Sequence, residues 1–121
     1  MSQVTVRSFE EIVRGVREQI EIACFSELER DSAEEIALII AEIYGLPSDS
    51  SVRIDGQSMT CGMVSEVYKR LTCEHIREVM RRFYRASYPI KHRKTYLRTS
   101  LYNEVFEHES GIANGVACAL S

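Results

Sequence analysis

The residues with the clearest chemical potential in this sequence are arginines and lysines gathered in one stretch. Ten Lys or Arg and two Glu lie between Lys69 and Arg98, a net charge of +8, whereas residues 1–68 carry −8 and residues 99–121 carry −3. Exposed charges act over roughly 8 Å at physiological salt, so a local basic field persists although the whole chain carries −3. This segregation predicts a basic surface that favours an acidic ligand.

Helical spacing divides the basic stretch into two stripes. Arg77, Arg81 and Arg85 follow i, i+4, i+8 spacing on one predicted helix, and Lys94 and Arg98 share a face of the next helix, beyond a break at Pro89. Arginine and lysine neutralise phosphates, and tyrosines stack on unpaired bases. The predicted nucleic-acid-binding residues are Arg77, Arg81, Arg85, Lys91, Arg93, Lys94, Tyr96 and Arg98.

Two other interpretations of the basic stretch stay open. The cations either form a solvated face that pairs with the acidic helices upstream, or they meet an acidic patch on a protein partner. The upstream carboxylates available for such pairing are Glu10, Glu11, Glu18, Glu21, Glu34, Glu35 and Glu42.

Residue types that support catalysis or metal binding show no productive pattern in the sequence. It has no glycine-rich phosphate loop, no nucleophile elbow and no paired acid and base on a known motif. Cys73 and His75 lie two residues apart on a predicted helix and diverge by about 200°. We expect the three histidines to lie at the surface, Cys24 and Cys73 to be core residues, and the protein to be non-enzymatic, with no cofactor and no metal.

The first half of the chain predicts two helices. Ser8 with Glu11 forms a capping-box pattern before a helix over 9–20, and a short buried helical turn is expected over 22–28. Ser32 with Glu35 forms a second capping-box pattern. It precedes a run, through residue 44, that is apolar on nearly all sides and ends at Gly45.

The second half predicts a β-hairpin and three helices. Asp55-Gly56 is typical of a type I′ turn and predicts strands at about 52–54 and 57–59. Thr60 and Thr72 precede helices predicted over 61–70 and 73–86, with Met63 among the inward residues, and a fifth helix is predicted over 92–107. The predicted fold class is therefore mainly α, with about five helices and one small hairpin (about 52–59) between helices 2 and 3.

Length and composition predict one small domain. The 121 residues, 45% of them hydrophobic, fit a single helical domain over 1–108 followed by a loosely ordered tail over 109–121. No apolar run reaches the roughly 20 residues of a membrane span, and the N-terminus lacks the apolar centre of a signal peptide. The four cysteines have no paired spacing. We expect a cytoplasmic protein with no membrane partner.

Four stretches of the sequence resemble a known family. They are Ile54–Gln57, Val64–Leu71, Thr72–Ile76 and Ile90–Asn103, within roughly residues 9–107. They resemble the C-terminal domain of unknown function of RepA-type replication initiators, which plasmids and conjugative elements of Firmicutes carry. The terminal stretch is also distantly similar to the last helix of DnaD-like primosomal domains.

The resemblance implies a role accessory to DNA replication. It assigns DNA contact to Lys91, Arg93, Lys94, Tyr96 and Arg98, which lie in the matching terminal stretch. We therefore expect a non-enzymatic DNA-associated accessory module of a plasmid or mobile-element replication initiator. The alternative is a protein-interaction or oligomerisation domain, which recruits host replication proteins or self-associates through its basic face.

Overall fold

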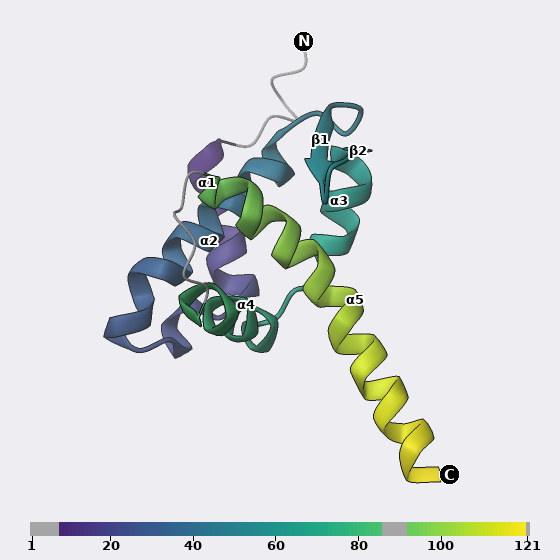
Figure 1. The fold of residues 1–121 in the computed structure, drawn as a ribbon. Coiled ribbons are helices and arrows are strands. Elements are labelled where there is room, and N and C mark those ends of the chain that lie inside the picture. The colour runs from purple at the N-terminus through teal and green to yellow at the C-terminus, as the bar shows by residue number, and fades with distance from the viewer. Residues whose placement is uncertain (1–7, 86–91, 121) are drawn as a thin grey trace.

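The computed structural model describes residues 8–85 and 92–120, with side chains described over 8–83 and 92–107. Five α-helices and one antiparallel hairpin between α2 and α3 make up these residues, which confirms the predicted fold class (Figure 1). The elements are α1 (Phe9–Gln19), a 3-10 turn (Ile22–Cys24), α2 (Glu27–Gly45), β1 (Ser51–Ile54), β2 (Gln57–Thr60), α3 (Cys61–Tyr68), α4 (Cys73–Arg85) and α5 (Arg93–Leu120).

Helix α2 forms the centre of the hydrophobic core. As predicted, its second half is buried on most sides, and Gly45 is its last residue. Helix α5 covers this core with Leu97, Leu101 and Val105, which recur every fourth residue along one face. The core residues of α2 are Ala33, Ile36, Ala37, Ile39, Ile40, Ala41 and Ile43.

The start of α2 differs from the sequence prediction. Ser26, not Ser32, is the N-cap: its hydroxyl accepts from the N–H of Glu29, and the Glu29 carboxylate accepts from the N–H of Ser26. Two capping-box patterns compete here, and the upstream one prevails because Phe25 is buried immediately before Ser26. Ser32 therefore lies inside the helix, and Glu35 is left to pair with another helix.

The turn between α1 and α2 is buried less than predicted. Glu21 adopts a left-handed conformation, with φ of 52°, and redirects the chain after α1. Phe25 is buried, but Cys24 is exposed and Leu28 is 94% exposed. The predictions of a core Cys24 and of a buried turn reaching Leu28 were wrong, because the turn points only Ile22 and Phe25 toward the core. Cys73, also predicted as core, is half-buried.

The hairpin forms as predicted. Ile54 pairs with Gln57, and the turn residues Asp55 and Gly56 have φ of 54° and 79°. Positive φ at both positions is the type I′ geometry. Val52 and Ile54 are buried against the helices, and the N–H of Asp55 donates to Thr99 Oγ1 on α5 at 3.0 Å. These contacts attach a hairpin that would be marginal alone.

Helix α3 begins at the predicted cap, and its interior differs at one position. The hydroxyl of Thr60 accepts from the N–H of Met63. Met63 itself is 57% exposed, so the prediction that it faces inward was wrong. Val64 and Tyr68 occupy the inner face instead, and Tyr68 donates its hydroxyl to the carbonyl of Arg98 at 2.7 Å.

A buried histidine caps helix α4. His75 is 7% exposed, and its Nδ1 accepts from the backbone N–H of Thr72 at 2.9 Å. The prediction that this histidine lies at the surface was wrong, because the third helical residue turns back to satisfy the N-cap. His92 is exposed as predicted, whereas the side chain of His108 lies outside the described side chains.

Helix α5 is longer than predicted. It continues through Leu120 instead of ending near residue 107, so residues predicted as an irregular tail extend the helix. Alanine and leucine are the strongest helix formers, and this end of the chain contains several of them. Figure 1 shows the C-terminal part of α5 running beyond the other elements. None of the described helices is long and apolar enough to cross a membrane.

Candidate interaction surfaces

The first cation of the predicted stripe holds α4 to the turn before α2. Arg77 Nη2 donates to the carbonyl of Cys24 at 2.8 Å, and its guanidinium lies 4.9 Å from the ring centroid of Phe25. Both contacts join segments about fifty residues apart in the sequence. Arg77 therefore already has two internal partners, although its side chain is exposed.

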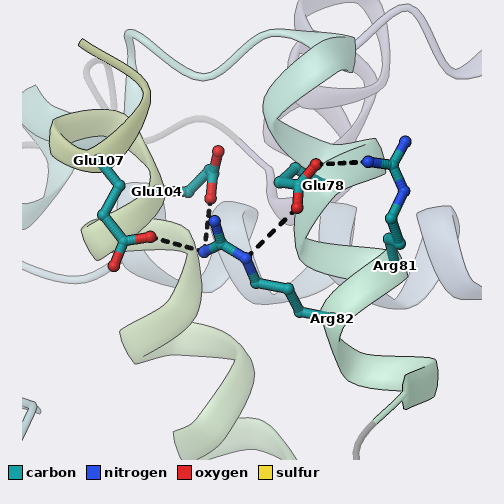
Figure 2. A network of polar contacts seen from close by, with 5 residues as sticks. All are labelled: Glu78, Arg81, Arg82, Glu104 and Glu107. Carbon is teal, nitrogen blue, oxygen red and sulfur yellow. Dashed lines mark hydrogen bonds and ion pairs between the residues drawn. The ribbon is translucent and has the colours of Figure 1, made fainter. Parts of the chain in front are cut away.

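Arg82 is the centre of a cluster of charges between α4 and α5 (Figure 2). Its guanidinium contacts Glu104 at 2.8 Å and Glu107 at 2.6 Å on α5, and Glu78 at 3.4 Å on its own helix. These contacts, led by the hydrogen bond to Glu107, raise the pKa of Arg82. Arg81 pairs with the other oxygen of Glu78 at 2.8 Å. We call these five residues the Arg82 cluster.

Glu104 is the buried member of the Arg82 cluster. It is 2% exposed, whereas Glu107 and Arg81 lie mostly in solvent. A buried carboxylate requires a close cation, because desolvation of an unpaired charge is costly. Arg82 supplies that cation from α4, and the pair thereby fixes α4 against α5.

Three further cations form the α2–α5 seam, which joins the start of α5 to α2. Arg93 grips Glu35 through two nitrogens, at 2.5 and 2.6 Å. Two turns farther along α2, Glu42 accepts from both Lys94 and Arg98, each at 2.7 Å. Arg98 is largely buried, with its side chain 16% exposed. All three cations of the seam are therefore paired with carboxylates of α2, the helix at the centre of the core.

Glutamates pair with most of the described cations of α4 and α5. Among the described side chains, α4 and α5 carry six cations, here called the stripe, and five of the six contact glutamates. The cations are Arg77, Arg81, Arg82, Arg93, Lys94 and Arg98, and the glutamates are Glu35, Glu42, Glu78, Glu104 and Glu107. The paired set thus carries +1. The predicted site residues Arg85 and Lys91 lie outside the described side chains.

Tyr96, predicted to stack on bases, packs against the edge of the core. Its ring centroid lies 5.6 Å from that of Phe83 on α4, and the ring is only partly exposed. Arg93 lies 4.6 Å from the same Phe83 centroid. The structure thus brings Tyr96 and Arg93 together around Phe83, where they join α4 to α5.

A second kind of surface, the α3–α5 patch, is apolar. We define it as Met63, Val67, Arg70, Tyr102 and Phe106. Phe106 is 41% exposed, and its ring lies 5.3 Å from that of Tyr102 and 5.7 Å from the guanidinium of Arg70. Met63 and Val67 lie one turn apart on α3, which packs against α5. Methionine, aromatic residues and arginine are the types enriched at protein interfaces.

A groove with a volume of about 640 Å³ lies between α1, the end of α2 and α3. Gln19 closes its floor by donating to the carbonyls of Tyr68 and Leu71, at 2.8 and 3.0 Å, and by accepting from Tyr44 at 2.8 Å. Burial raises the pKa of the Tyr44 hydroxyl to about 12. We call this feature the α1–α3 groove.

The described residues show no arrangement that favours metal binding or a reactive nucleophile. No group of three His, Cys, Asp or Glu in this part of the chain is arranged to hold a metal ion. Cys61 is buried, and desolvation raises the pKa of its thiol. His75 is occupied as a helix cap.

The sequence named Glu35 and Glu42 among seven upstream carboxylates able to pair with the basic stretch, and both do so. It did not single them out, and it did not predict the partners Glu78, Glu104 and Glu107 or the α3–α5 patch. Glu35 and Glu42 are seven residues apart, which places them on one face of α2, and this spacing was the available signal. Phe106 continues the helical spacing of Tyr102, but an aromatic residue at such spacing is more often core than surface.

The chain matches no protein-family model, no curated protein and no solved structure.

Proposed function

We propose that this chain is a non-enzymatic accessory module of a replication initiator that works by binding protein, in the first instance a second copy of itself. The replication setting rests on the resemblance of Thr72–Ile76 and Ile90–Asn103 to the RepA-type initiator domain. The mode of action rests on the α3–α5 patch. Met63 is exposed on α3, and Phe106 is exposed on α5 beside Arg70 and Tyr102.

A second copy is the partner that best fits the position of the patch. Phe106 directly follows Val105, which is buried, and α5 then continues to Leu120, with its C-terminal part running beyond the other elements (Figure 1). A helical segment of about 12 residues is marginal in water without packing. A second copy lying along α5 would cover the patch and support that segment at once.

Light scattering after size-exclusion chromatography tests the proposal. The wild-type protein is expected to show a concentration-dependent dimer, and Phe106→Ser is expected to shift it toward monomer. Leu28→Ser is the matched control, because Leu28 is an exposed apolar residue at the N-terminal end of α2 and is not part of the α3–α5 patch. A wild-type protein that stays monomeric at high concentration, or a dimer that Phe106→Ser leaves intact, would rule out self-association through the patch.

Contact with DNA is a second candidate function, favoured by one observation. The side chains of Arg81 and Lys94 remain 59% and 56% exposed although both are paired. Exposed ion pairs contribute only about 0–1 kcal/mol, so phosphates are able to compete for these cations. The sequence-predicted residues would then give weak, non-specific backbone contacts.

Fluorescence anisotropy with single- and double-stranded DNA over a salt series tests this second candidate. Binding through the stripe is expected to weaken with salt and with Arg81→Gln. Arg14→Gln, on the exposed surface of α1, is the control for the loss of one charge. No binding at low salt, or equal losses from the two variants, would contradict DNA contact through the stripe.

A further inference from the structure

A hollow with a volume of about 460 Å³ lies between the hairpin, the end of α2 and the first turns of α5. The charged residues that line it are Arg53 and Arg98, and both are cations. Its volume falls within the range of about 300–1,000 Å³ that is typical of ligand sites. We call this feature the hairpin hollow, and the residues that give it its chemistry are Leu46, Ser51, Arg53, Ser58, Thr95 and Arg98.

The register of the hairpin brings polar side chains together on its outer face. Arg53 and Ser58 are direct cross-strand partners, so their side chains lie on the same face of the sheet. Ser51 shares this face, because alternate residues of a strand point the same way. These three residues are exposed, whereas Val52 and Ile54 are buried on the other face. The hairpin therefore contributes one cation and two hydroxyl groups to the hollow.

Arg53 is held in place without being neutralised. Its Nη2 donates to the carbonyl of Gly56 at 3.0 Å, which keeps the guanidinium beside the turn. Among the side chains that the structure describes, no carboxylate forms an ion pair with Arg53. A guanidinium has five N–H donors, so most of the hydrogen-bonding capacity of Arg53 is available to a ligand.

Arg98 is only partly neutralised by its carboxylate partner. Its Nη2 donates to Glu42 at 2.7 Å, but Glu42 also accepts from Lys94. Within the described residues, Arg98 Nε is buried and has no hydrogen-bond partner. Glu42, Lys94 and Arg98 together carry +1, and Arg53 raises the charge around the hollow to +2. This excess positive charge favours an anionic ligand.

We propose that the hairpin hollow binds a phosphate group. Phosphate carries about two negative charges near neutral pH, which matches the excess charge. Its oxygens accept from guanidinium and hydroxyl groups at the same time, and Thr95 adds a third hydroxyl from α5. A carboxylate has one charge and two oxygens, so it would leave one cation unpaired. Leu46, which is 39% exposed, offers apolar contact to an organic part of the ligand and so favours a phosphate monoester over free phosphate.

This proposal goes beyond self-association, because the hairpin hollow and the α3–α5 patch have no residue in common. The two are therefore tested by separate measurements. Loss of phosphate binding in a hollow variant is expected to leave the dimer seen by light scattering intact.

Isothermal titration calorimetry of the full chain with three probes tests the proposal. Adenosine 5′-monophosphate carries the phosphate, adenosine lacks it, and inorganic phosphate lacks the organic part. The monophosphate is expected to bind at least about tenfold more tightly than adenosine. Tighter binding of the monophosphate than of inorganic phosphate would support a phosphate monoester as the ligand, and equal binding would support free phosphate. Equal binding of the monophosphate and adenosine, or no binding of either phosphate at about 10 mM, would overturn the proposal.

Two variants of the hairpin locate the phosphate. Arg53→Gln removes an exposed cation whose bond goes to the turn, and Ser58→Asp places a carboxylate beside Arg53. Each is expected to weaken binding of the monophosphate at least about tenfold, with an unchanged thermal unfolding midpoint. Arg14→Gln is the matched control, because Arg14 is an exposed arginine on α1 outside the hollow.

The same titrations define the results that would contradict the site. Arg53→Gln and Arg14→Gln that weaken binding equally, or hollow variants that bind as the wild type does, would overturn the proposal. NMR shifts of the Gly56, Ser58 and Thr95 amides on addition of the monophosphate would support it. Shifts confined to Arg81 and its neighbours on α4 would place the anion on the stripe and overturn it.

Discussion

Arg93 holds the carboxylate of Glu35 through Nε and Nη2, and so fixes the first turn of α5 against α2 across 58 positions of sequence. The pair lies at the place where the sequence predicted phosphate binding. A two-point grip of this kind is geometrically demanding, so it holds α5 in one rotational setting.

A double-mutant cycle measures the coupling of Arg93 and Glu35. Arg93→Gln, Glu35→Gln and the double variant are expected to give a coupling free energy of about 1 kcal/mol in urea unfolding, because both groups are partly shielded and their contact is bidentate. The same cycle on Lys69 and Glu66, which are well exposed, is expected to give almost none. Equal couplings for the two pairs would show that the bidentate contact adds nothing.

Arg82 and Arg81 are neighbours of the same type with different roles. Arg82→Met is expected to lower the free energy of unfolding by about 2 kcal/mol, because it removes the cation that contacts the buried Glu104 at 2.8 Å. Arg81→Met is expected to change it by less than about 0.5 kcal/mol. Adding Glu104→Gln to Arg82→Met is expected to restore part of the loss. If Glu104→Gln lowered the free energy of unfolding further, the buried carboxylate would not be the cause of the destabilisation in Arg82→Met.

Two serines test where α2 begins. Ser26→Ala is expected to cost about 1 kcal/mol in thermal or urea unfolding, whereas Ser32→Ala is expected to be neutral or slightly stabilising. The hydrogen bond from the Ser26 backbone lowers the pKa of Glu29, so the stability this carboxylate contributes is present at neutral pH and is lost as the pH falls below 4.5. If Ser32→Ala cost more stability than Ser26→Ala, the cap would lie at Ser32, as the sequence predicted.

Tyr44 predicts a loss of stability in alkali. Burial raises its pKa in the folded protein to about 12, against about 10 in an unfolded chain. The neutral hydroxyl is therefore favoured by folding, and its contribution is complete below pH of about 10 and lost as the pH rises toward 12. Partial exposure limits the effect to about 1–2 kcal/mol. Urea unfolding of wild type and Tyr44→Phe across this range is expected to show a shallower decline in the variant, and parallel curves would contradict the assignment.

The sequence predicted the elements of this fold well because their signals are local. Asp55-Gly56 specified the hairpin turn, and Thr60 specified the start of α3. Where two local signals competed, as with the capping patterns at Ser26 and Ser32, the burial of Phe25 decided between them. That burial depends on contacts between distant segments, which a local pattern does not contain.

The candidate surfaces were harder to predict for the same reason. The periodicity of the arginines identified the stripe, and the sequence offered seven upstream carboxylates as partners. Only the crossing of α5 over α2 selects Glu35 and Glu42 among them. The groove is equally non-local, since Ile12, Leu46 and Ser65 come from three segments.

The length of α5 has a mechanical consequence. A helix of 28 residues spans about 42 Å, and its first half carries Leu97, Leu101 and Val105 in the core. The second half is therefore a continuation of a helix whose first half is anchored in the core. A change in the direction of the far end would therefore be carried along one helix to the bidentate contact between Arg93 and Glu35.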